Sequence, residues 1–68
     1  MSREAFEARI IAEADWYTAC RFLGCGNYDT RCFESQAKAE ASAPGDGRTM
    51  IYAVGGSPYR FTIHIRNI

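Results

Sequence analysis

The sequence predicts an α+β domain with the element order α-β-α-β-β. Three observations predict it: a helix-forming N-terminal third, a capped helical segment in the middle, and two alternating segments at the end of the chain. Sixty-eight residues, 47% of them hydrophobic, are enough for one modest core. We therefore expect a single domain over residues 1–68, with two helices packed on one face of a three-stranded, mostly antiparallel sheet.

The N-terminal third is typical of one long helix. Ser2 is a good N-cap residue, and neither Gly nor Pro occurs between Arg3 and Leu23. Apolar residues recur at helical spacing over this stretch. Gly24 then supplies the left-handed conformation that commonly closes a helix.

A second interpretation of this stretch stays open. In it the helix ends near Asp15, residues 16–23 form a strand, and residues 24–27 close a hairpin, because Trp, Tyr, Thr and Phe favour strands. We favour the long helix, since a strand over residues 16–23 would carry apolar groups on both of its faces.

The middle of the chain predicts a short strand followed by a short helix. Residues 28–33 alternate in the manner of a strand, and Ser35 is placed to cap a helix over roughly Gln36–Ala43. The turn-forming sequence Pro-Gly-Asp-Gly at residues 44–47 then ends that helix.

The last third predicts a β-hairpin. Residues 48–54 and 59–68 have strand character, and the loop Gly-Gly-Ser-Pro joins them. Alternation in the second strand points one set of side chains to the core and the other to solvent. The core set is Tyr59, Phe61, Ile63 and Ile65, and the solvent set is Arg60, Thr62, His64 and Arg66. In the first strand Met50, Tyr52 and Val54 are expected to face the core.

No cysteine, glycine or histidine pattern in the chain predicts a cofactor, a metal site or an enzyme. The gaps between Cys20, Cys25 and Cys32 are four and six residues, which do not match paired zinc ligands. The glycines around Cys25 follow a predicted helix, the reverse of a phosphate-binding loop. His64, the sole histidine, stands on a predicted solvent face among Arg60 and Arg66, and this setting alone does not make it a catalytic base. We therefore expect a non-enzymatic protein without cofactors.

Composition narrows the classes of partner and location. Eight Lys and Arg balance eight Asp and Glu, and a net charge of zero argues against a nucleic-acid footprint. No apolar run approaches the length of a membrane span, and residues 2–7 lack the apolar stretch of an export signal. We expect a cytoplasmic protein whose three cysteines are thiols.

The exposed side of the final hairpin is the surface with most functional promise. Arginine binds carboxylate and phosphate groups through two parallel hydrogen bonds, and an isoleucine beside arginines is typical of a protein-binding patch. The predicted partner-binding residues are Arg48, Arg60, Thr62, His64, Arg66 and Ile51. We expect a module that binds another protein.

Two alternatives to a protein-binding module remain. In one, Arg48, Arg60 and Arg66 contact the phosphates of a nucleic acid. In the other, copies of the chain form a homodimer or larger assembly by pairing their sheet edges, although Asp29 and Arg31 would protect one such edge.

In its small size and its lack of an enzyme motif, the chain resembles phage-borne inhibitors of bacterial host defence, anti-CRISPR proteins among them. The resemblance is of kind, and it assigns no site residues. It implies a steric mechanism, in which the protein occupies a surface of a defence complex.

Overall fold

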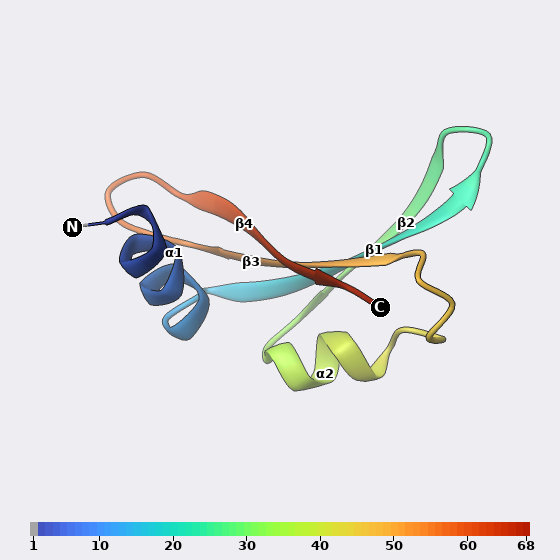
Figure 1. Ribbon diagram of the computed structural model, residues 1–68, viewed down its shortest axis with the longest axis horizontal. Helices are drawn as coiled ribbons and strands as arrows, with labels where there is room; N and C mark the ends of the chain where they lie inside the picture. The colour runs from blue at the N-terminus through green and yellow to red at the C-terminus, as the bar shows by residue number, and fades with distance from the viewer. Residues whose placement is uncertain (1) are drawn as a thin grey trace.

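The computed structural model describes residues 2–68 as two helices and a four-stranded antiparallel sheet with the strand order β2-β1-β3-β4 (Figure 1). The elements in chain order are α1 (Arg3–Ala12), β1 (Trp16–Gly24), β2 (Asn27–Phe33), α2 (Gln36–Ala41), β3 (Thr49–Gly55) and β4 (Phe61–Asn67). The α+β class is confirmed. The expectation of three strands is wrong, because the chain forms four.

The missing strand is β1, which the long-helix interpretation assigned to α1. The helix ends at Ala12, and its C-cap Glu13 donates its backbone N–H to the Arg9 carbonyl at 3.0 Å. β1 lies at the centre of the sheet and pairs with β2 on one side and with β3 on the other. These two ladders satisfy its backbone on both edges and outweigh the local helix propensity. The apolar residues on both faces of β1 argued against a strand in the sequence. They suit a strand at the centre of a sheet.

Gly24 closes a β-hairpin and does not cap a helix. Gly24, Cys25 and Gly26 have φ angles of 93°, 53° and 76°, and Gly24 pairs with Asn27 across a two-residue turn. A positive φ at both central residues is what the tight hairpin turn of a twisted ribbon requires. In Figure 1 the tip of this β1–β2 hairpin extends away from both helices.

Several local features agree with the sequence. The Ser2 hydroxyl accepts a hydrogen bond from the Ala5 N–H, and the Ser35 hydroxyl accepts one from the Lys38 N–H, so both serines cap helices. α2 ends two residues earlier than expected, and β3 and β4 form the expected hairpin. Neither helix in residues 2–68 is long and apolar enough to cross a membrane.

The core lies between the two helices and one face of the sheet, here called the covered face. Its buried centre is Ala19 of β1, Ala39 of α2 and Ile51 of β3. The partly buried residues packed against this centre are Tyr17, Phe33, Ile65 and Ile68. Tyr17 also donates its hydroxyl hydrogen to the Ile11 carbonyl of α1. Because α1 bonds to Tyr17 and α2 supplies Ala39 to the core on which Tyr17 packs, α1 and α2 cover the same face, as Figure 1 shows.

β3 presents the opposite face to the one expected. Ile51 and Ala53 are fully buried on the covered face. Met50 and Tyr52 therefore point to the other side of the sheet by alternation, as does Val54. The expectation that these three face the helices is wrong. Apolar residues occupy both sets of positions in this strand, so a period of two could not indicate which set is inside.

A β-bulge interrupts the alternation of β4. Tyr52 pairs with His64 and Ile51 pairs with Arg66, which leaves Ile65 as the extra residue. Beyond the bulge Arg66 lies on the covered face, where its guanidinium is 3.5 Å from the Glu40 carboxylate of α2.

The residues before the bulge depart from the predicted core set at two positions. Tyr59 lies in the loop and is 74% exposed, so its predicted place in the core is wrong. Phe61 is 41% exposed, so its predicted burial is wrong too, although its ring packs edge-on against Phe6 of α1 with centroids 5.1 Å apart.

Candidate functional site

The sheet face opposite the helices, here called the open face, is the candidate site. Alternation and strand register place residues from all four strands on it. They are Trp16, Thr18, Cys20 and Phe22 of β1, Tyr28, Thr30 and Cys32 of β2, Met50, Tyr52 and Val54 of β3, and Thr62, His64 and Asn67 of β4. Both helices lie on the other side of the sheet (Figure 1).

Aromatic side chains run across the open face. Phe22 and Tyr28 stack at a tilt with ring centroids 5.4 Å apart, and they are 38% and 53% exposed. Tyr52 lies 5.3 Å from the His64 ring, and its hydroxyl is 3.3 Å from the Met50 sulfur. These contacts fix the rings against one another in advance, which lowers the entropy cost of binding a partner.

The open face carries almost no formal charge. None of its strand residues is Asp, Glu, Lys or Arg. Among residues 2–68 the cation placed at this face is Arg60, whose guanidinium lies 4.6 Å from the centroid of the Trp16 ring and 3.4 Å from the Asp15 carboxylate. Arg60 therefore caps one end of the face as a paired, stacked group.

Three of the predicted partner-binding residues lie at the open face. Thr62 and His64 project from β4, and His64 is hydrogen-bonded to Asn67 at 2.7 Å. Arg60 reaches the face from the loop before β4.

The other three predicted partner-binding residues lie elsewhere. Ile51 is 0% exposed in the core, so its expected exposure is wrong. The bulge moves Arg66 to the covered face, and Arg48 lies in the loop before β3. The continuous arginine ladder expected from strict alternation does not form.

The residues that sequence reasoning missed are mainly those of β1 and β2. Trp16, Thr18, Cys20 and Phe22 were assigned to a helix, so no surface could be built from them. The pattern that would have found them is the strand-forming run after Asp15 followed by a turn sequence.

Nearly every cation of the described residues is paired with a carboxylate of the same molecule. Seven of the eight Lys and Arg side chains make such a pair, and Arg48 makes none. The pairs are Arg3–Glu7, Arg9–Glu13, Arg21–Asp46, Arg31–Asp29, Lys38–Glu34, Arg60–Asp15 and Arg66–Glu40. A phosphate backbone would have to displace these carboxylates before it could bind.

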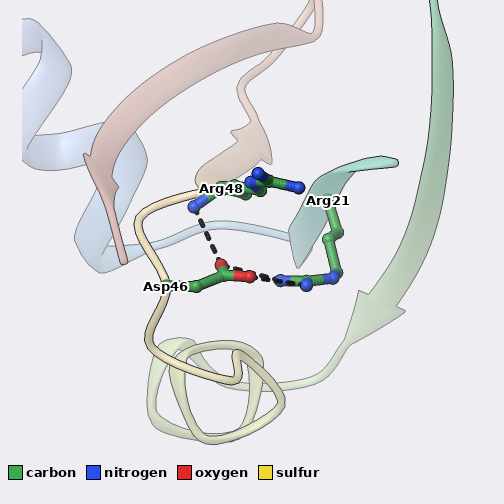
Figure 2. A network of polar contacts seen from close by, with 3 residues as sticks. All are labelled: Arg21, Asp46 and Arg48. Atoms are coloured by element: carbon green, nitrogen blue, oxygen red, sulfur yellow. Dashed lines mark hydrogen bonds and ion pairs between the residues drawn. The ribbon is translucent and has the colours of Figure 1, made fainter. Parts of the chain in front are cut away.

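One of these pairs ties the loop after α2 to the sheet (Figure 2). The two terminal nitrogens of Arg21 donate to the two carboxylate oxygens of Asp46 at 2.8 and 2.6 Å, and the Arg48 backbone N–H donates to Asp46 at 3.1 Å. The hydrogen bonds from Arg21 are the main reason that the pKa of Asp46 falls from 3.8 to about 2. This contact is structural, since it consumes the groups that could bind a ligand.

Replacing Asp46 with asparagine is expected to lower stability modestly at neutral pH and to change the response to acid. The folded-state pKa of Asp46 is below its ordinary value. Its contribution is therefore fully present above about pH 4 and is lost as the pH falls toward 2. The stabilities of wild type and Asp46→Asn should converge over that window, as measured by urea unfolding at a series of pH values. A difference that stays constant from neutral pH to pH 2 would contradict this assignment.

The described residues contain no other constellation with evident chemistry. No three His, Cys, Asp or Glu side chains in residues 2–68 converge to hold a metal ion. A shallow hollow of about 320 Å³ lies between α1 and the β3–β4 loop, and a second of about 290 Å³ lies beside α2. The first is lined by Phe6, Arg9, Ile10, Glu13, Asp15, Gly56, Ser57 and Phe61, and the Phe6 and Phe61 rings pack on each other across it.

Comparisons with known proteins add no information about the open face. No protein-family model, no curated protein and no solved structure matches the chain.

Proposed function

We propose that the protein is a small non-catalytic binding module whose open face occupies the surface of a partner protein. The observation that carries the proposal is a four-stranded sheet face that neither α1 nor α2 covers and whose described strand residues include aromatic side chains without formal charges. Depletion of charge together with enrichment in Trp, Tyr, Met and Arg is typical of the centre of protein interfaces. Phe22 and Tyr28, which stack on each other and are 38% and 53% exposed on this face, are large apolar residues left for a partner to cover.

Trp16, Tyr52 and Arg60 are the residues expected to contribute most of the binding energy. Trp, Tyr and Arg dominate interface hot spots. Trp and Tyr bury large areas with few rotatable bonds, and Arg presents a planar guanidinium with several hydrogen-bond donors. Arg60 already stacks on Trp16 at 4.6 Å and pairs with Asp15, so it adds little ordering cost when a partner arrives. The partner surface that fits this face is itself apolar or aromatic.

The narrower form of the proposal is inhibition by steric occupation of a bacterial defence complex. It follows from the resemblance in size and in lack of a catalytic set to phage-borne inhibitors. In this form the open face covers a surface that the complex needs for recruitment or for nucleic-acid binding.

Single-stranded nucleic acid is the second candidate partner. The aromatic rings of Trp16, Phe22, Tyr28 and Tyr52 favour it, because bases stack on sheet platforms of this type. The paired cations oppose it, because a nucleic-acid site must supply free positive charge to replace counterions. The balance therefore favours a protein partner.

Charged substitution at Phe22 tests the open face as a binding site. Phe22 and Leu23 are adjacent and both exposed, at 38% and 56%, but Leu23 lines the hollow beside α2 on the covered side. Phe22→Asp should weaken capture of the partner from bacterial lysate at least about tenfold, because an interface aromatic commonly contributes more than 1 kcal/mol. Leu23→Asp is the matched control and should retain capture.

Two outcomes would contradict the proposal that the open face binds a partner protein. Equal capture by the Phe22 and Leu23 variants, with circular dichroism showing both folded, would remove the open face as the interface. Retention of single-stranded DNA or RNA that falls steeply between about 50 and 200 mM salt would favour the nucleic-acid candidate.

A further inference from the structure

The open face leaves the hydrophobic core of this chain incomplete. The buried hydrophobic residues in the described part of the chain number six, and three of them are alanines. Ile51 and Thr49 are the largest fully buried side chains, whereas larger residues such as Trp16 and Tyr52 are only half-buried on the open face. A two-layer domain with one uncovered layer gains little from burial.

The overall dimensions agree with an incomplete core. The chain exposes 4667 Å², whereas a compact monomer of its mass exposes about 4,300 Å². Its radius of gyration is 12.3 Å, whereas about 11 Å is typical of a compact domain of this length. The molecule is thinner and has more surface than its mass requires, as expected of a subunit that packs against another layer.

We infer that the open face packs against the open face of a second copy of this chain, giving a two-fold symmetric dimer with two facing sheets. The inference rests on the proposed function, since it uses the same open face as a protein-binding surface, and it names a second copy as the partner in place of a component of a defence complex. Absence of like-charge repulsion favours a copy: the face has no formal charge on its strands, and Arg60 at its end is paired with Asp15. Two such faces meet without burying like charges against each other.

Both edge strands of the sheet carry features that hinder strand pairing between copies. β4 carries the bulge at Ile65, which twists an edge strand away from regular pairing. β2 carries Asp29 and Arg31, which form an ion pair at 3.3 Å along the other edge. Face-to-face packing is therefore the route by which a second copy covers the exposed aromatic residues.

The area of the open face suits a weak, reversible dimer. Four strands spaced about 4.8 Å apart, with about 3.3 Å of rise per residue, give a flat footprint of roughly 500 Å² on each copy. A dimer then buries roughly 1,000 Å² in total, which is below the about 1,200–2,000 Å² of stable interfaces and in the range of transient ones. We expect dissociation on dilution rather than a permanent assembly.

Opposite charges at Thr18 test the two-fold arrangement. Thr18 lies on the central strand β1 and pairs with Tyr52 of β3, near the middle of the open face. A two-fold axis through this region brings each Thr18 close to its own copy. Thr18→Glu and Thr18→Lys should each sediment as monomers, and an equimolar mixture should recover the dimer. Ala8→Glu and Ala8→Lys, on the exposed side of α1, should remain dimeric.

A measurement on the wild type keeps the inference testable if the Thr18 variants do not fold. Trp16 is the sole tryptophan and lies at the open face. Its fluorescence emission should shift to longer wavelength as dilution separates the dimer and exposes the ring to water. Sedimentation of the same dilution series should show a dimer becoming a monomer.

Different negative results separate an error in the dimer inference from an error in the proposed function. A monomeric wild type whose Phe22→Asp variant loses another protein partner would overturn the second copy and leave the proposed function in place. A wild-type dimer that both Thr18 variants and Phe22→Asp leave intact would overturn the open face as a protein interface.

Discussion

Replacing Ile51 with alanine is expected to cost about 2–5 kcal/mol of stability, which is the usual cost of such a cavity in a packed core. Ile51 is 0% exposed and lies at the centre of the core cluster, opposite Ala19 of β1. Its neighbours Ala19 and Ala39 are too small to fill the space. A domain of this size has little stability in reserve, so much of the variant should be unfolded. Urea unfolding followed by circular dichroism measures the loss.

Ile51→Val is the matched control, with an expected cost of about 0.5–1.5 kcal/mol. Wild type and variants must be compared at the same protein concentration, because self-association would raise apparent stability. A cost below about 1 kcal/mol for Ile51→Ala would mean that the side chain is exposed, as the sequence pattern suggested, and that the register of β3 is different.

Replacing Gly56 with alanine is expected to cost about 3 kcal/mol or more. Gly56 has a φ of +120°, and an added Cβ would lie 2.6 Å from the Tyr59 carbonyl oxygen and 3.3 Å from Ile10 Cδ1. Backbone strain at such a φ costs about 1–3 kcal/mol, and the clash with a backbone oxygen adds to it. The close approach lets the β3–β4 loop pack against α1.

Gly45→Ala separates the two contributions to this cost. Gly45 has a similarly positive φ of +88°, but nothing lies within 4 Å of an added Cβ. Only the strain of about 1–2 kcal/mol should appear there. Thermal and urea unfolding of the two variants measure the difference, and equal losses would show that the β3–β4 loop does not approach as closely as described.

The parts of the fold that the sequence predicted are those with strong local determinants. Ser35 caps α2 through its own side chain, and the turn at residues 44–47 follows from its Pro and Gly residues. The strands of the last hairpin were also recognisable, because β-branched and aromatic residues flank a glycine-rich loop. These features depend on residues close together in the chain.

The parts that the sequence did not predict depend on distant contacts. β1 is a strand because β2 and β3 pair with it, and no Gly or Pro before Gly24 marks its start. Likewise, nothing in β4 itself marks Ile65 as the bulged residue; the register with β3 decides it. Because β1 is a strand of the sheet, the candidate site is an aromatic face and not the arginine ladder that the sequence predicted.

The pairing of nearly every cation in the described residues with a carboxylate on the same molecule also has a kinetic consequence. Such pairs cancel at short range, so little field extends into solvent to guide an approaching partner. Productive collisions then occur at the unsteered rate of about 10⁵–10⁶ M⁻¹ s⁻¹. Selectivity among partners then depends mainly on the dissociation rate of each complex.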